Sequence, residues 1–366
     1  MTNRQLKYLT CISVVMAAGI GAAAPSATAT ATATVAAARH TVRAGESIQE
    51  AVDAAKPGDT ITVMPGTYRE NVLITKRLTL RGWGSQTVIM PPAAAPAPLP
   101  ARAVTPCSQA DTGICVMGTA ARTVDRVTIR ALTLSGFKRN GLWASYTDRL
   151  TVEKVTSEKN GTWGMAQEHS TRGVFRYNVA RDNAESGIFI ANTVAREGGA
   201  IDTLGAVVRR NTLTGNRIGV TARRVRNMTI HDNTLTGNCG GVFVVGDEGE
   251  PGAGDMTIRG NRIHANNKFC RGNSRLPDIQ GAGIVLTGAE ETIIRTNSIR
   301  DNVGASPISG GILLFKSFVG AQNTDNVIRD NLVRGNKPAD LANQGTGTGN
   351  TFRGNQCQVS QPAGMC

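Results

Sequence analysis

A short phrase recurs along most of this chain and constrains its fold more than any other feature. The phrase is an apolar residue, two variable residues and an asparagine, as in Ile258-Arg-Gly-Asn261. Successive copies lie 22 to 36 residues apart, so the repeating unit has about 22 residues and insertions lengthen some copies. The phrase ends at Asn178, Asn211, Asn233, Asn261, Asn297, Asn331 and Asn355, and two earlier copies carry Leu132 and Val155 instead of the asparagine.

Each unit contains three short segments in which apolar residues alternate with polar ones, for example 228–230, 234–236 and 242–244. Alternation with a period of two predicts strands with one buried face, and one unit cannot bury that face alone. We therefore predict an all-β fold, a single-stranded right-handed parallel β-helix of about ten to eleven coils. Leucine-rich repeats require a Leu-x-x-Leu-x-Leu pattern that this chain lacks.

The repeating asparagine is expected at a tight bend between two strands. Asparagine tolerates the left-handed backbone that such a bend needs, so we place the asparagine itself in that conformation. Its side-chain amide can then bond to the asparagine one coil further along.

Residues 39–66 are predicted to form an amino-terminal cap and a first strand. Ser47-Ile-Gln-Glu50 fits a capping box at the start of a helix, which we expect to close the open end of the β-helix. The apolar face of this helix comprises Ile48, Ala51, Val52 and Ala55.

The first 38 residues have the pattern of a secretory signal peptide: a basic start, an apolar run and small residues with A-x-A cleavage sites. We expect residues 39–366 to form the mature, extracellular β-helix, because no later stretch approaches the roughly 20 apolar residues of a membrane span. Cleavage removes two basic residues and lowers the net charge from +13 to +11. This surplus favours polyanions, although the dispersal of the basic residues along the sequence argues against nucleic acid.

Six cysteines follow the signal peptide, and an even number in an exported chain indicates disulfides. We predict that nearest neighbours pair. Cys107–Cys115 would close a Pro/Ala-rich insertion at 91–118, Cys239–Cys270 would join adjacent coils, and Cys357–Cys366 would tie the tail at 357–366. The cysteines show no zinc-binding arrangement with histidine, and we predict no metal site.

The amino-terminal segment resembles a known family. The runs 47–55 and 56–59, followed by Val63-Met-Pro-Gly-Thr-Tyr-Arg-Glu70, are similar to the start of secreted β-helix proteins. These include pectate-lyase-like enzymes and nitrous-oxide-reductase maturation proteins. The resemblance covers most of 41–356 and is specific for the fold, whereas its members include lyases, hydrolases, epimerases and adhesins. It implies that a polysaccharide binds along one sheet, here called the front sheet.

Alignment of the units predicts one outward-facing row on the front sheet: Trp143, Trp163, Phe189, Gly219, Phe243, Val285 and Leu313. Two interpretations stay open. The aromatic side chains could form a stacking platform for sugar rings, or an insertion could fold over the row and bury it. Insertions flank this sheet at 193–206, 247–255, 268–280 and 303–309.

Catalytic groups are expected in the turns just after the front strands. The resemblance implies outward Lys or Arg as base, often with calcium held by front-strand Asp or Glu, but the predicted outward front positions carry no acid. Glu168 and His169 could act as general acid and base, and Arg223 and Arg224 could hold a carboxylate or sulfate. A surface histidine and a solvated arginine pair are the alternatives. We assign catalysis to Glu168, His169 and Arg223, and substrate binding to Trp143, Trp163, Phe189, Phe243, Tyr146, Asn192 and Arg224.

The acidic loop 247–250 with Asp255 could attract calcium, but it lacks the alternating ligands of a dedicated calcium loop, so we expect no cofactor. We predict a secreted monomer that binds a polymeric, acidic carbohydrate of the extracellular space or cell wall, and neither nucleic acid nor membrane. If it is an enzyme, it is a polysaccharide lyase, epimerase or glycoside hydrolase. The alternative is a non-catalytic glycan-binding or cell-surface structural protein. A metalloenzyme maturation factor is disfavoured, since no copper-binding Met/His/Cys cluster stands out.

Overall fold

The structure, a computed structural model, describes residues 37–93, 111–192, 198–273, 276–317, 319–345 and 347–366. Residues 37–366 form one compact unit. The signal peptide predicted at 1–38 therefore lies almost entirely outside the described residues. Within those residues, no helix is long and apolar enough to cross a membrane.

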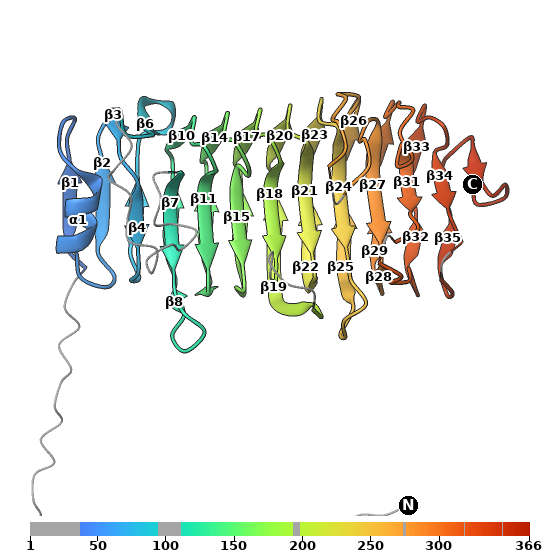
Figure 1. Ribbon diagram of the computed structural model, residues 1–366, viewed down its shortest axis with the longest axis horizontal. Helices are drawn as coiled ribbons and strands as arrows, with labels where there is room; N and C mark the ends of the chain where they lie inside the picture. The colour runs from blue at the N-terminus through green and yellow to red at the C-terminus, as the bar shows by residue number, and fades with distance from the viewer. Residues whose placement is uncertain (1–36, 94–110, 193–197, 274–275, 318, 346) are drawn as a thin grey trace, which may run out of the picture. The chain divides into compact units, whose positions relative to one another are not determined.

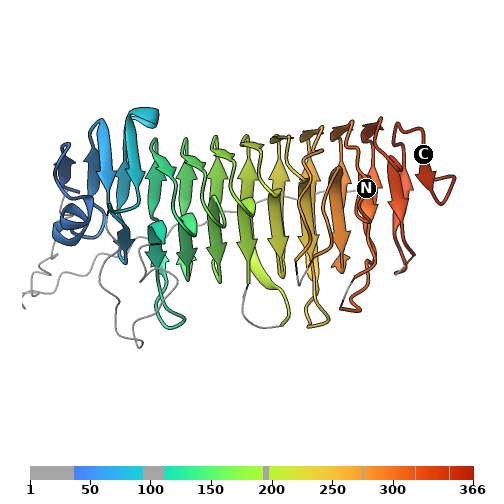
Figure 2. The same ribbon diagram turned by 45° about the horizontal axis from the view of Figure 1, so that its top comes forward.

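Three parallel sheets run the length of this unit, and consecutive coils lie side by side along it (Figures 1 and 2). Each coil passes through sheet A, sheet B and the front sheet in turn, and each strand pairs in register with the equivalent strands of the neighbouring coils. The predicted parallel β-helix is confirmed. A small extra sheet pairs β8 (Val124–Asp125) with β12 (Thr147–Asp148).

Sheet A contains, in spatial order, β1 (Arg39–Val42), β2 (Thr60–Val63), β5 (Thr79–Arg81), β9 (Thr128–Arg130), β13 (Thr151–Glu153), β16 (Val174–Arg176), β19 (Ile201–Arg209), β22 (Val225–His231), β25 (Ala253–Arg259), β29 (Ile293–Arg295), β32 (Val327–Arg329) and β35 (Thr351–Arg353). The short strand β28 (Ala289–Glu290) also pairs with β25.

Sheet B contains β3 (Gly66–Arg69), β6 (Thr87–Met90), β10 (Thr133–Ser135), β14 (Thr156–Glu158), β17 (Val179–Arg181), β20 (Thr212–Thr214), β23 (Thr234–Thr236), β26 (Arg262–His264), β30 (Ser298–Arg300) and β33 (Leu332–Arg334).

The front sheet contains β4 (Val72–Ile74), β7 (Thr112–Met117), β11 (Asn140–Ser145), β15 (Met165–Glu168), β18 (Ser186–Ala191), β21 (Ile218–Arg223), β24 (Gly240–Val245), β27 (Ala282–Thr287), β31 (Gly310–Leu314), β34 (Leu341–Asn343) and β36 (Ser360–Gln361).

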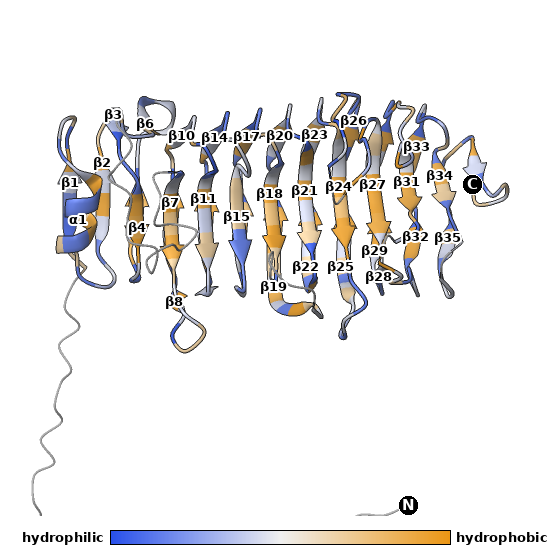
Figure 3. Cartoon of the chain, viewed as in Figure 1, coloured by the Kyte–Doolittle hydropathy of each residue, from blue (hydrophilic) through white to orange (hydrophobic). Residues whose placement is uncertain are grey.

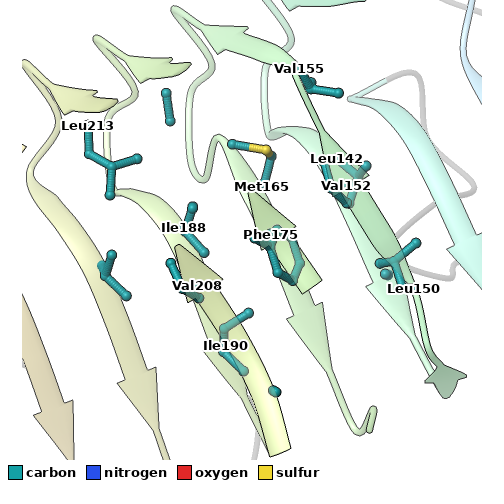
Figure 4. Close-up of a cluster of buried hydrophobic side chains, with 14 of the residues drawn as sticks. Leu142, Leu150, Val152, Val155, Met165, Phe175, Ile188, Ile190, Val208 and Leu213 are labelled. Atoms are coloured by element: carbon teal, nitrogen blue, oxygen red, sulfur yellow. The ribbon is translucent and has the colours of Figure 1, made fainter. Parts of the chain in front are cut away.

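The core fills the interior of the coils with one or two inward side chains from each strand. Figure 4 shows Phe175 and Val208 from sheet A meeting Ile188 and Ile190 from the front sheet, with Leu213 from sheet B nearby. All five are buried. Burial of each such side chain contributes about 1.5–3 kcal/mol, and stacking makes this core continuous from coil to coil.

The predicted asparagine ladder lies at the bend from sheet A to sheet B. The side-chain nitrogen of Asn233 donates to Oδ1 of Asn261 at 3.0 Å, and Asn261 donates in the same way to Asn297 at 2.9 Å. The predicted backbone conformation is wrong: the left-handed residue is the one before each asparagine, such as Asp232 and Thr296. That residue makes the turn, while the buried asparagine provides the hydrogen bonds that hold it.

A second ladder, missed in the sequence, lies at the bend from sheet B to the front sheet. Asn238 donates to Asn266 and Asn266 to Asn302 through the same side-chain contacts, at 2.8 and 2.9 Å. The residue before each asparagine is again left-handed, as at Gly237. Both bends of a coil are thus fixed by buried amides.

The predicted amino-terminal helix is present as α1 (Ile48–Ala54), which buries Ile48 and Val52. Ser47 accepts a hydrogen bond from the Glu50 nitrogen, as a capping box requires. In a capping box the glutamate side chain also accepts a hydrogen bond from the start of the helix, but Glu50 does not do so here. The carboxylate of Glu70 instead accepts from Ser47 Oγ and from the nitrogens of Ile48 and Gln49 at 2.8–3.0 Å, so β3 and the loop after it anchor the cap.

Two predicted disulfides are confirmed. Cys239 bonds to Cys270 with their Cα atoms 5.9 Å apart, and Cys357 bonds to Cys366 with a Cα distance of 5.2 Å. Cys115 is a disulfide cysteine, but Cys107 lies outside the described residues, so their pairing stays a prediction.

Candidate functional site

The first outward row of the front sheet differs from the prediction at two positions. Strand register places Ala166 between Trp143 and Phe189, and Thr221 between Phe189 and Phe243. Trp163 and Gly219 are therefore not members of the row. The alignment failed because Trp163 precedes β15, which starts at Met165, and because Gly219 corresponds to Gly241 of the next coil rather than to Phe243.

Trp163 nevertheless joins the same aromatic group. Its ring stacks on Trp143 with centroids 5.4 Å apart and on Phe189 at 4.3 Å. It therefore lies between the rings of the neighbouring coils, above the position that small Ala166 leaves open.

The aromatic side chains of this row are buried. Trp143, Phe189 and Phe243 are 3%, 5% and 1% exposed, and Trp163 is half-buried. Ile279 and Ile308 belong to the insertions before β27 and β31 and pack in the same apolar cluster as Phe243. Of the two interpretations, burial by an insertion therefore holds around Phe243. The insertions cover this part of the row, and a sugar ring has no access to the face of Phe243. Figure 3 shows the hydrophobic character of β18, β24 and β27.

A second outward row crosses the carboxyl ends of the front strands. It includes Ser145, Glu168, Ala191, Arg223 and Val245 in consecutive coils. Glu168 and Arg223 were predicted in turns, but they are the last residues of β15 and β21, because these strands extend further than the alternation indicated. The expectation that no acid faces outward from the front strands is therefore wrong.

Glu168 and Arg223 are both half-buried and stand two coils apart, with Ala191 between them. Two strand spacings correspond to roughly 10 Å between their backbones. The side chain between them is a single methyl group. An acid and a base of opposite charge thus flank a position occupied by a small residue.

The bend that follows this row carries three more predicted residues. Tyr146, His169 and Asn192 occupy the same place in consecutive coils, and each donates its backbone N–H to the next coil at 3.2–3.3 Å. The rings of Tyr146 and His169 stack with centroids 4.9 Å apart and an interplanar angle of 8°. Both rings are half-buried. The structure thus brings Tyr146, Glu168, His169, Asn192 and Arg223 together along one edge of the front sheet, which we call the front edge.

An ion pair fixes the two bends that carry Tyr146 and His169. Asp148 accepts from Nε of Arg172 at 2.6 Å and from Nη2 at 2.7 Å, and from the Thr171 hydroxyl at 2.8 Å. Burial raises the pKa of the Asp148 carboxyl, but the hydrogen bonds from Arg172 and Thr171 hold this pKa below its usual value. The bidentate pair joins one coil to the next immediately after the stacked rings.

Arg224 and Asn192 have protein partners. The buried Arg224 forms an ion pair with Asp247, and Asn192 donates from its side chain to the Gly199 carbonyl at 2.8 Å. Asp247 belongs to the acidic loop considered for calcium, but its carboxylate pairs with Arg224 instead of joining the other acids of that loop. In the described part of the chain, no three His, Cys, Asp or Glu residues gather as a metal site.

Sequence reasoning missed a row of charged residues on the outer face of sheet A. The residue after each inward side chain of this sheet is basic in nearly every coil, and strand register aligns these residues into one line. The signal was present in the phrase itself, whose first variable position is usually arginine. We call this line the arginine row; it comprises Arg81, Arg130, Glu153, Arg176, Arg209, His231, Arg259, Arg295, Arg329 and Arg353.

Several solved structures have the same fold. The Azotobacter vinelandii mannuronan C-5 epimerase AlgE4 A-module is 18% identical over 86% of this chain and 90% of its own, with a TM-score of 0.54. DFA-IIIase from Arthrobacter chlorophenolicus A6 is 13% identical over 88% of this chain and 84% of its own, with a TM-score of 0.56. The Dettilon tailspike protein is 12% identical over 83% and 62%, with a TM-score of 0.55.

No curated protein matches this chain in sequence. The likeness to the solved structures is below the identity at which activity can be carried over, so it concerns the fold alone. A family model described as the right handed beta helix region matches residues 105–197 and 199–365, which is most of the chain. Together with the three stacked parallel sheets, this match shows that the chain belongs to the right-handed β-helix family.

Proposed function

We propose that this protein is exported and binds a polymeric acidic carbohydrate at the front edge, where it transfers protons to and from a sugar ring. The observation that carries the proposal is the grouping of Glu168, His169 and Tyr146 in two adjacent coils, with Arg223 two coils from Glu168. These residues combine groups that can exchange protons with a cation that can pair with a carboxylate.

The reaction class that suits these groups is proton removal from the carbon next to a uronate carboxylate. Arg223 would pair with the carboxylate and favour the negative charge that develops when the proton leaves. Glu168 or His169 would act as the general base that takes the proton. Tyr146 would act as the general acid that donates one. If a proton returns to the opposite face of that carbon, the product is an epimer. If the neighbouring glycosidic oxygen leaves with a proton, the chain is cleaved by elimination.

The comparisons support this class without fixing it. One structural neighbour is a mannuronan C-5 epimerase, and epimerisation at C-5 of a uronic acid is a proton transfer of this kind. The charge of the protein agrees, since the net charge of +11 that remains after cleavage of 1–38 attracts acidic polymers.

Export is part of the proposal. The basic, apolar and small-residue segments at 1–38 support a cleaved signal peptide. The disulfides Cys239–Cys270 and Cys357–Cys366 support an oxidising compartment, because thiols stay reduced in the cytosol.

A second candidate function, glycan binding without turnover, is favoured by the burial of Trp143, Phe189 and Phe243. The faces of these three rings cannot stack on a sugar ring, so they do not hold a substrate over Glu168. In this case the front edge would be a contact surface and no product would form.

The test uses residues 39–366 with a panel of polyuronates and neutral glycans. Absorbance of unsaturated products detects elimination, nuclear magnetic resonance detects a change of configuration, and reducing ends detect hydrolysis. We expect turnover of a polyuronate, and a loss of about 100-fold or more in Glu168→Gln and His169→Asn. Matched controls are Glu158→Gln and His264→Asn, which lie on sheet B and should keep full activity.

Binding without any product would replace the first candidate by the second. Absence of both binding and product would contradict both. Equal losses in the front-edge variants and their sheet B controls would exclude the assigned site even if the protein is active.

A further inference from the structure

The carboxyl-terminal part of the arginine row forms a line of basic residues on the outer face of sheet A. From Arg209 to Arg353, six consecutive coils contribute arginine or, at His231, histidine, and no acid lies in the row itself. Neighbouring strands are about 4.8 Å apart, so these six positions span roughly 24 Å. Residues that are dispersed in the sequence thus become one continuous surface.

Most of this charge is not neutralised within the protein. The side chains of Arg81, Arg209, Arg259, Arg295 and Arg353 form no ion pair with any described residue. Acids neutralise other members: Glu153, which itself belongs to the row, binds Arg130 and Arg176, and Asp330 binds Arg329. Asp232, at the adjacent bend, contacts His231 at 3.0 Å and Arg210 at 4.0 Å.

A phenol beside the row is surrounded by arginines, of which Arg210 is the nearest. The hydroxyl of Tyr177 lies 2.7 Å from Arg210 Nη1. This hydrogen bond, together with the charges of Arg210, Arg209 and Arg176, lowers the pKa of Tyr177 below its usual value. An anion at this surface gains from the same field.

A shallow hollow lies beside the middle part of the row. A hollow of about 380 Å³ is lined by Val174 and Val207 on one side and by Arg176, Arg209 and His231 on the other, with Thr151 at its end. Apolar side chains there can contact the C–H face of a sugar ring while the guanidinium groups reach its carboxylate.

The described links on one side of this row, at the corner between sheets A and B, are too short to cover it. From β9 to β33, each link from sheet A to sheet B contains two residues, such as Arg210 and Asn211 between β19 and β20. The long insertions occur at the other two corners of the coil, as between β26 and β27. The six positions from Arg209 to Arg353 are half-buried or exposed, whereas Phe243, Val285 and Leu313 of the front row are buried.

We infer that the arginine row binds a linear polyuronate laid across the strands of sheet A, with successive sugar carboxylates meeting successive coils. A polyuronate carries one carboxylate on each ring, at intervals similar to the spacing between strands. Arginine binds carboxylate through two parallel hydrogen bonds, which suits this repeat. Duplex DNA fits less well, because its phosphates follow a helix that curves away from a straight line of charges.

The inference rests on the proposed function only for the class of polymer, since it concerns a different face. It gives the protein a second contact surface that holds the polymer, separate from the front edge where the reaction is proposed. Binding by the row would hold long chains near that edge and have little effect on fragments too short to span several coils.

The experiment compares two triple variants of residues 39–366, each losing three positive charges. Arg209→Gln, Arg259→Gln and Arg295→Gln change the row. Arg262→Gln, Arg300→Gln and Arg334→Gln are the control, because these arginines are exposed on sheet B. Titration calorimetry at low salt measures binding of a galacturonate oligomer of about ten sugars, and thermal unfolding checks that both variants are folded.

We expect the row variant to bind the oligomer about 10-fold more weakly and the control to bind as the unchanged protein does. Equal losses in both variants, or no loss in either, would overturn the inference. Comparable binding of neutral dextran would also overturn it. If duplex DNA binds more tightly than the galacturonate oligomer and this binding is lost in the row variant, the row binds nucleic acid and the inference of a polyuronate is wrong.

Front-edge variants separate this inference from the proposed function. Glu168→Gln should retain binding of the ten-sugar oligomer, and the row variant should retain any turnover of a trimer. Loss of oligomer binding in Glu168→Gln with none in the row variant would place the polymer at the front edge alone and contradict the inference.

Discussion

The front sheet and sheet A are built from the same coils but use their outward side chains in opposite ways. The front sheet presents Phe243, Val285 and Leu313, which are almost fully buried because insertions fold over them. Sheet A presents Arg259, Arg295 and Arg329, which stay partly open to solvent. In a β-helix the corner loops therefore decide whether an outward row becomes a second core or a contact surface.

Part of this difference lies in the corners. From β9 to β33, the corner between sheets A and B is closed by two residues and bends at a buried asparagine such as Asn261, so this corner provides no loop to cover the face. The two corners beside the front sheet accept long insertions, and the Cys239–Cys270 disulfide ties one of these down. The predictions below test this division, from the largest expected effect to the smallest.

The largest contrast should be in stability. Phe243→Ala removes a buried ring from under the insertions and should lower the free energy of unfolding by about 3–5 kcal/mol. Arg295→Ala removes an open side chain without an ion pair and should change it by less than about 0.5 kcal/mol. Urea unfolding followed by circular dichroism measures both. Similar losses in the two variants would mean that the two rows do not differ in the way described.

Removing the Cys239–Cys270 disulfide should affect only the front sheet. Replacing both cysteines by serine should destabilise the protein by about 2–4 kcal/mol, since the disulfide closes a segment with a sequence separation of 31. Hydrogen exchange should increase in 265–281 and in β24. Affinity for a polyuronate should not change, because the arginine row lies on another face. A loss of affinity that accompanies the loss of stability would argue that the polymer contacts the insertion.

Salt should distinguish the two faces through binding. Raising sodium chloride from about 50 to 200 mM should weaken polyuronate binding by about 10-fold, because the bound polymer releases counterions and exposed charges are screened. The triple row variant should show a flatter dependence. Calorimetry across this range measures how the dissociation constant depends on salt concentration. If this dependence is the same in the row variant, the row does not bind the polymer.

The smallest effect should come from the amino-terminal cap, which lies outside both the front row and the arginine row. Hydrogen bonds from His40 and from the nitrogens of Lys56 and Ala38 lower the pKa of Asp59 from 3.8 to about 2. The folded pKa is depressed, so Asp59 stabilises the protein above about pH 4 and loses this contribution as the pH falls towards 2. The difference in melting temperature between the unchanged protein and Asp59→Asn should shrink over this range. A constant difference would mean that the carboxylate charge is not what stabilises the cap.

The sequence was sufficient for the fold because the repeat records it directly. Alternation with a period of two and a recurring asparagine identify strands and bends, and the cysteine spacing located Cys239–Cys270 and Cys357–Cys366. The predicted left-handed conformation of the asparagine was wrong because the residue that adopts it varies in type from coil to coil, as at Asp232 and Thr296, and so forms no recurring pattern in the sequence.

The site was harder to predict than the fold. Trp163 and Gly219 were misplaced because the sequence does not mark where each front strand begins. The row passes through Ala166, three residues after Trp163, and through Thr221, two residues after Gly219. Burial of Phe243 depends on Ile279 and Ile308, and sequence does not say on which side their loops fold. The arginine row could have been predicted, since arginine follows the apolar residue in phrase after phrase, as at Arg259 and Arg295.

The most direct test of the division between the two faces is a map of arginine protection. The protein is treated with an arginine-specific reagent with and without the ten-sugar galacturonate oligomer, and modified peptides are quantified by mass spectrometry. We expect protection of Arg209, Arg259 and Arg295, and unchanged modification of Arg300 and Arg334 on sheet B. Equal protection of both groups, or protection confined to sheet B or to the front edge, would contradict this expectation.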